Sequence, residues 1–141
     1  MHASLARVLF EQDVEALRAM LENRRWTLNS AVFPIIDVTF EGSRPLRMRL
    51  DCESWDSDPP SGELLNADGT PLSGPIPGGQ FHAGPHPGTG RPFVCMRGFR
   101  EFHTHPSHLN EVWDAYRGQD GMNLPGLLDQ VSRSWRRLVG K

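Results

Sequence analysis

The residues best suited to chemistry gather between positions 82 and 108. This stretch contains Cys95, one of two cysteines, and five of the six histidines, which are His82, His86, His103, His105 and His108. Histidine is costly to bury without a partner or a task, so packing alone is a poor explanation for the cluster. Two chemistries could use it: a cysteine nucleophile surrounded by imidazoles, or a metal site built on the two histidines of a His-x-His sequence.

The composition predicts a single domain over residues 1–141, because a chain of 141 residues with 38% hydrophobic residues can bury one core. The formal charge of −2 gives no reason to expect nucleic acid or an anionic membrane as a partner. The sequence shows neither a long apolar run nor a typical signal peptide. Two cysteines in such a chain indicate reduced thiols and a cytoplasmic location.

Hydrophobic periodicity predicts helices at both ends of the chain and strands between them. Strict alternation in the second strand points Cys52 inward, which indicates a buried structural cysteine. Ser4 is expected to cap the first helix. The expected helices cover residues 4–23, residues 110–117 and a last segment from Leu124, and the expected strands cover residues 31–40 and 46–53.

Residues 56–92 form a segment of unusual composition, with eight of the twelve prolines and eight of the fourteen glycines. Neither a helix nor a regular strand is expected to run long through it. Ile76 and Phe81 could pin this segment to the core, so we expect a long ordered flap rather than a linker between domains. The order of elements predicts an α+β domain with an antiparallel sheet.

The residues around Cys95 carry a family resemblance. His86-Pro87 precedes Cys95 by nine residues, with Gly90 and the apolar pair Phe93-Val94 between them. In this motif and in its order of elements the chain resembles the ubiquitin-conjugating enzymes, as a divergent bacterial-type member. The resemblance implies a UBC-like fold, with an N-terminal helix, an antiparallel β-meander, the long Pro/Gly flap and C-terminal helices.

The resemblance also implies a function. Cys95 would accept a ubiquitin-like protein as a thioester from an activating (adenylating) enzyme and pass it to an amine on a target protein, without a cofactor. Similar bacterial proteins occur in antiphage conjugation systems. The neighbouring imidazoles, with Arg91 or Arg97, are expected to raise the thiolate fraction of Cys95.

One departure from the family pattern concerns the residue after His-Pro, where the family has asparagine and this chain has Gly88. If the resemblance holds, His86, His103 or His105 would take over oxyanion stabilisation or deprotonation of the incoming amine. The chain has fourteen arginines and a single lysine, Lys141, which would limit modification of the protein by itself.

Two alternatives remain open. The segment His103-Thr104-His105-Pro106 resembles the His-x-His-Pro core of JAMM-type zinc isopeptidases, although Tyr116 occupies the place of the expected aspartate and Asp114 comes two residues early. Zinc would then be the cofactor. The other alternative is a binding domain of the same fold without catalysis. The candidate zinc ligands are His103, His105 and His108.

Overall fold

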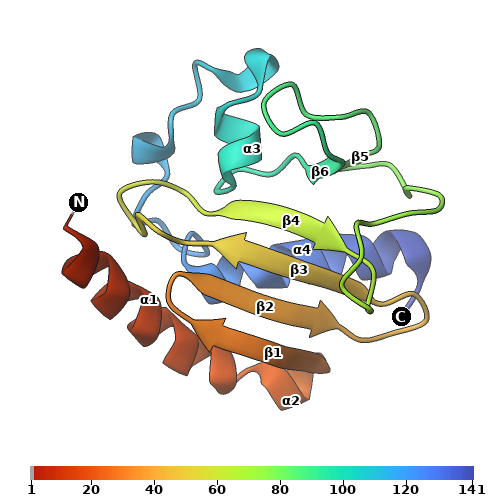
Figure 1. The fold of residues 1–141 in the computed structure, drawn as a ribbon, viewed down its shortest axis with the longest axis horizontal. Helices are drawn as coiled ribbons and strands as arrows, with labels where there is room; N and C mark the ends of the chain where they lie inside the picture. The colour runs from red at the N-terminus through yellow and green to blue at the C-terminus, as the bar shows by residue number, and fades with distance from the viewer. Residues whose placement is uncertain (1) are drawn as a thin grey trace.

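An antiparallel meander forms the centre of the computed structural model, which describes residues 2–141. Each strand pairs with the next one along the chain (Figure 1). The strands are β1 (Trp26–Val32), β2 (Ile35–Phe40), β3 (Leu46–Asp51) and β4 (Ser61–Leu65). The α+β class with an antiparallel sheet is therefore confirmed.

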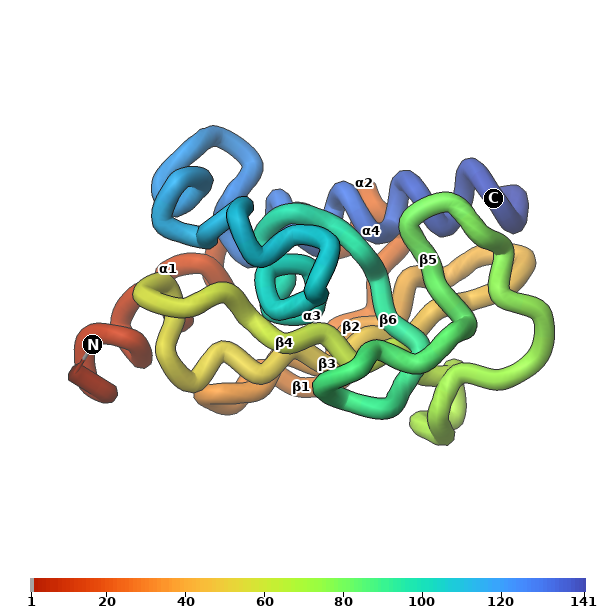
Figure 2. The backbone as a smooth tube through the Cα atoms, turned by 90° about the horizontal axis from the view of Figure 1, so that it is seen from above, coloured from red at the N-terminus to blue at the C-terminus, as the bar shows by residue number. Residues whose placement is uncertain are grey.

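Helices cover one face of this sheet, and shorter elements extend beyond the β4 edge (Figures 1 and 2). The helices on the covered face are α1 (Ala3–Arg18), α2 (Leu21–Arg24) and α4 (Leu124–Val139). Among residues 2–141, no helix has the length and apolar character that crossing a bilayer requires. The elements beyond β4 are β5 (Phe81–His82), β6 (Phe93–Val94), α3 (Arg100–His103) and two 3₁₀ turns, Pro106–His108 and Trp113–Ala115.

The core lies between the sheet and helices α1 and α4. Leu46, Met48 and Leu50 of β3 point into it and are fully buried, as their alternation predicts. Cys52, directly after β3, is 1% exposed, so the prediction of a buried cysteine is confirmed. Trp135 of α4 is 1% exposed and closes the core on the helical side.

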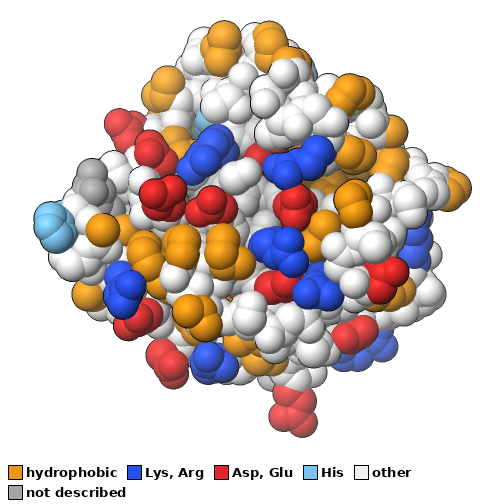
Figure 3. Space-filling model, viewed as in Figure 1, with side chains coloured by type: hydrophobic (Ala, Val, Ile, Leu, Met, Phe, Trp, Pro, Cys, Tyr) orange, Lys and Arg blue, Asp and Glu red, His pale blue; other side chains and the backbone are white. Residues whose placement is uncertain are grey.

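The outer face of the sheet carries a network of charges, visible over the centre of the molecule in Figure 3. Asp37 is 4% exposed and pairs with Arg47 at 2.8 Å and with Arg49 at 3.3 Å. Arg49 also pairs with Glu63 at 3.2 Å, and Glu63 with Arg91 at 2.7 Å. These pairs join β2, β3 and β4 and tie the end of the flap to the sheet.

The flap is ordered against the core, as expected. Phe81 is 2% exposed and meets the ring of Trp135 edge-on, with centroids 5.1 Å apart. Ile76 packs against the core as a partly buried side chain. No long regular element runs through residues 56–92, as expected, but the sequence pattern did not predict the short strand β4, which occupies Ser61–Leu65 and pairs with β3 throughout.

Two of the expected elements are divided in the structure. The helix expected over 4–23 breaks near Ala19-Met20, and its N-cap is His2, whose ring accepts a hydrogen bond from the backbone N–H of Ser4. The strand expected over 31–40 is a hairpin that turns at Phe33-Pro34, because proline has no N–H to donate to the ladder. The sequence pattern did not predict β1, which is an edge strand with both polar and apolar residues.

The prediction of a helix over residues 110–117 is wrong. This segment forms the 3₁₀ turn Trp113–Ala115 instead, and the helical turn α3 lies earlier, at Arg100–His103. The last helix begins at Leu124 as expected, with Asn123 as its N-cap accepting from the N–H of Gly126.

Candidate functional site

Cys95 follows β6 directly, at the place where the flap returns to the sheet. Its backbone N–H donates to the carbonyl oxygen of Gln80 at 2.7 Å, and Gln80 immediately precedes β5. The short pairing of β5 with β6 therefore extends to Cys95 and fixes its backbone. The side chain of Cys95 is half-buried, whereas that of Cys52 is buried. Cys95 is the thiol that a large partner can reach.

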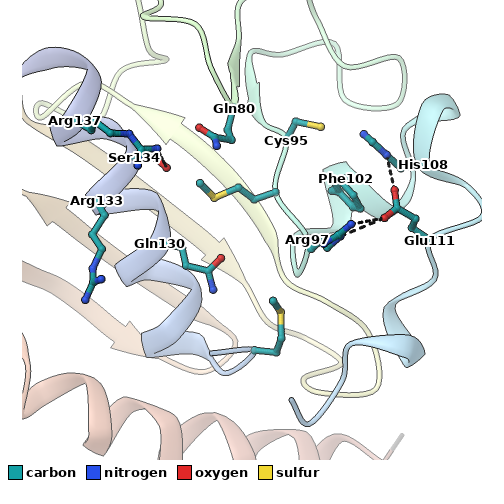
Figure 4. A pocket seen from close by; sticks show the side chains of 12 residues that line it. Gln80, Cys95, Arg97, Phe102, His108, Glu111, Gln130, Arg133, Ser134 and Arg137 are labelled. Carbon is teal, nitrogen blue, oxygen red and sulfur yellow. Dashed lines mark hydrogen bonds and ion pairs between the residues drawn. The ribbon is translucent and has the colours of Figure 1, made fainter. Parts of the chain in front are cut away.

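A groove of about 540 Å³ opens beside Cys95. One wall carries Cys95, His108 and Glu111, and the other wall comes from α4 with Gln130 and Ser134 (Figure 4). The sulfur of Cys95 points toward the side on which His108 lies (Figure 4). The groove therefore brings together a thiol, an imidazole and a carboxylate from a segment of seventeen residues, 95–111.

His108 and Glu111 form a hydrogen-bonded pair in this groove. Nδ1 of His108 lies 2.8 Å from Oε2 of Glu111, and the ring stacks on Phe102 with centroids 4.0 Å apart. Glu111 also accepts from Arg97 at 3.0 Å and from the Tyr116 hydroxyl at 3.1 Å. The hydrogen bond with His108, followed by those from Arg97 and Tyr116, lowers the pKa of Glu111. An ionised Glu111 orients the ring and leaves Nε2 of His108 as the nitrogen able to exchange a proton.

The pKa of Cys95 is raised, first by burial and then by the negative charge of Glu111. The expectation that Arg91 or Arg97 would favour the thiolate is therefore wrong. Arg97 is neutralised by its bonds to Glu111, and Arg91 pairs on the outer face of the sheet. At neutral pH Cys95 is a thiol, and its reaction as a nucleophile requires a base.

His86, which was expected among the catalytic residues, is buried and hydrogen-bonded to the backbone. It is 2% exposed, its Nε2 lies 2.8 Å from the carbonyl oxygen of Glu101, and its Nδ1 accepts from the N–H of Gly88 at 2.9 Å. Both ring nitrogens are thus engaged, and the ring joins the flap to α3. A Cβ at position 88 would come within 3.3 Å of the His86 ring, which gives a steric reason for glycine at this position.

His103 is also held by the backbone. Its Nδ1 lies 2.6 Å from the carbonyl oxygen of Glu111, and its Nε2 accepts from the N–H of Gly98 at 3.0 Å. Burial lowers the pKa of His103, so the ring is neutral at physiological pH. The ring therefore links the loop at Gly98 to the backbone of Glu111, and this link positions Glu111 for its hydrogen bond with His108.

His105 lies outside the groove as well. Its ring stacks on Phe93, with centroids 5.7 Å apart, and its Nδ1 caps the following turn by accepting from the backbone N–H of Ser107 at 3.2 Å. Burial, with the neighbouring histidines His86, His108 and His82 after it, lowers its pKa. Of the candidate residues, Cys95 and His108 line the groove, while His86, His103 and His105 do not.

The candidate zinc ligands are not assembled into a site. Within the described chain, residues 2–141, no group of three or more His, Cys, Asp or Glu side chains is arranged to hold a metal ion. The hydrogen bonds of both His103 nitrogens already occupy the positions that a metal would need.

Sequence reasoning missed Glu111 as a partner of His108. The spacing of three residues between them was the available signal, since side chains three or four apart meet on one helical turn. The wall formed by α4 gave no local signal, because its residues are far from Cys95 along the chain.

Comparison with known proteins finds similarity to one family, over the part of the chain that contains Cys95 and the His108–Glu111 pair. The Y4jH-like family model, described as the Y4jH family, matches residues 86–136, which include Cys95, His108, Glu111 and most of α4. The uncharacterized protein y4jH of Sinorhizobium fredii (strain NBRC 101917 / NGR234) is 39% identical over 41 residues. This match covers 29% of the chain and spans 20% of the length of that relative.

Proposed function

We propose that the protein is a ubiquitin-like protein conjugating enzyme that carries its cargo as a thioester on Cys95 and passes it to an amine of a target protein. The supporting observation is the shared groove of Cys95 and the His108–Glu111 pair. The order of helix, antiparallel meander, flap, cysteine and C-terminal helix supports a UBC-like fold.

In the first step, Nε2 of His108 accepts the proton of the Cys95 thiol as sulfur attacks the thioester carbon on an activating enzyme. The new C–S bond forms, the C–S bond to the activating enzyme breaks, and the departing thiolate takes up a proton. The raised pKa of Cys95 makes this assistance necessary. Glu111 stabilises the imidazolium that forms on His108.

In the second step, a target amine attacks the thioester carbon on Cys95. His108 takes a proton from the attacking nitrogen, an amide forms, and Cys95 leaves as the thiol. No cofactor is needed. The partners are an activating (adenylating) enzyme, a ubiquitin-like protein and a target protein, within a cytoplasmic bacterial antiphage conjugation system.

The test is mass spectrometry of the protein incubated with its cognate activating enzyme, ubiquitin-like protein and ATP, with and without reductant. We expect an adduct that reductant removes, in the wild type and in Cys52→Ala, and no adduct in Cys95→Ala. The absence of an adduct from all three proteins, with stoichiometric zinc in the native mass, would transfer the function to the histidines.

A further inference from the structure

A second cavity, of about 470 Å³, lies along the C-terminal half of α4. Its lining is strongly basic and contains a single acidic side chain, that of Asp129. The charged residues that line it are Arg24, Asp129, Arg133, Arg136, Arg137 and Lys141. We call this cavity the arginine cleft. The whole chain has a formal charge of −2, so this positive charge is a property of the cleft and not of the protein as a whole.

The charges of the cleft are only partly neutralised within the protein. Asp129 is shared by Arg24 at 2.9 Å and Arg133 at 3.0 Å. Among residues 2–141, Arg136 and Arg137 have no carboxylate within 4.0 Å. The guanidinium of Arg136 donates to backbone carbonyls, and its Nε is buried without a partner. The cleft therefore retains a net positive charge.

The arginine cleft borders the Cys95 groove. Arg133 and Arg137 line both cavities. They are one helical turn apart on α4, and Figure 4 shows them on the same helix as Gln130, across the groove from Cys95. The side chain of Arg133 is 71% exposed. An extended segment can therefore reach from Cys95 along α4 into the cleft.

We propose that the arginine cleft binds an acidic peptide segment of the protein partner engaged at Cys95. The inference rests on the proposed function, because it takes Cys95 as the place where that partner is held. Carboxylates of the segment would pair with Arg133 and Arg137, whose planar guanidinium groups suit bidentate recognition. The cleft then selects partners that are acidic next to the reacting group.

Peptide binding tests this proposal without any thioester chemistry. Cys95→Ser protein is titrated into a fluorescein-labelled glutamate-rich peptide, and anisotropy is recorded. The same peptide with glutamine in place of glutamate is the neutral probe. We expect binding of the acidic peptide alone, and weaker binding as NaCl rises from about 50 to about 200 mM.

Charge variants locate the binding site. Adding Arg133→Glu and Arg137→Glu to Cys95→Ser should weaken acidic-peptide binding at least about ten-fold. Arg7→Glu with Arg18→Glu on α1 makes the same change in net charge on another exposed segment and should leave binding within about two-fold. Arg133→Gln with Arg137→Gln avoids placing glutamate beside Asp129, and should give an intermediate loss if the first variant is poorly folded.

Equal losses in the α4 and α1 variants would overturn the proposal, since net charge alone would then control binding. Displacement of the peptide by equimolar tripolyphosphate would also overturn it, because the cleft would then be a site for small anions. The two assays distinguish the two proposals. A missing thioester adduct would contradict the proposed function without changing the peptide-binding result. A failure of peptide binding would contradict the role of the cleft without changing the thioester result.

Discussion

Nδ1 of His108 lies 2.8 Å from Oε2 of Glu111, in the groove that also exposes Cys95. This relationship distinguishes His108 from His103, whose Nδ1 lies against a backbone carbonyl and whose Nε2 accepts from an N–H. A carboxylate partner stabilises an imidazolium, whereas a backbone N–H directed at Nε2 opposes it. These contacts are the reason that the proposed mechanism takes His108, and not His103, as its proton acceptor.

The first prediction concerns His108. Replacing it with glutamine should slow transfer of the thioester to a free amine about 100-fold, because the proton acceptor is lost. His105→Gln changes a neighbouring histidine outside the groove and should stay within about three-fold of wild type. Single-turnover discharge of the preformed thioester measures both. A larger loss in His105→Gln would instead give the catalytic role to His105, one of the three histidines that the sequence predicted for it.

A second prediction follows from the raised pKa of Cys95, which burial and then the charge of Glu111 cause. Its thiolate fraction at neutral pH is below that of a free cysteine, whose pKa is about 8.5. Alkylation by iodoacetamide should keep accelerating with pH beyond that value. In Glu111→Gln the midpoint should move to lower pH, because a nearby negative charge is removed. An unchanged or higher midpoint in this variant contradicts the assignment.

The third prediction concerns Asp37 on the outer face of the sheet. Burial alone would raise its pKa, but hydrogen bonds from Arg47 and Asn29, with the charges of Arg47 and Arg49, lower it overall. A carboxyl whose folded pKa is depressed stabilises the fold above the ordinary aspartate pKa. That contribution is lost as the pH falls through the folded pKa.

Asp37→Asn should therefore lower the free energy of unfolding at pH 7 by about 2–3 kcal/mol, since Arg47 loses its partner. The difference from wild type should begin to shrink below about pH 4, where the aspartate of the unfolded chain takes up a proton while the folded carboxyl, with its lowered pKa, stays ionised. Urea unfolding at both pH values measures it. A penalty that does not depend on pH would show that shape rather than charge matters at this position.

A fourth prediction separates structural from catalytic histidines. His86→Ala removes a buried ring that bonds Glu101 and Gly88, so it should destabilise the protein by about 2–3 kcal/mol. His82→Ala removes an exposed ring and should cost less than about 0.5 kcal/mol. Chemical denaturation measures both. Full stability of His86→Ala, together with lost transfer, would instead make His86 a catalytic residue.

Several features could be predicted from sequence because they depend on local patterns. The period of two in β3 placed Met48 and Cys52 in the core, and the helical spacing of apolar residues placed α4 from Leu124. The flap and its anchor Phe81 were recognisable from composition and an isolated aromatic residue. The edge strand β1 was missed, because its alternation breaks between Leu28 and Ser30, where the register with β2 shifts, and Trp26 is its one buried residue.

The sequence by itself determined that Cys95 and a group of histidines lie close together along the chain. The tertiary structure decided which histidine is available, because each imidazole takes its role from its hydrogen-bond partners. The partner of His86 comes from α3, and the wall facing Cys95 comes from α4. Sequence proximity placed these groups in one region, but long-range packing set their partners, their burial and hence their pKa values.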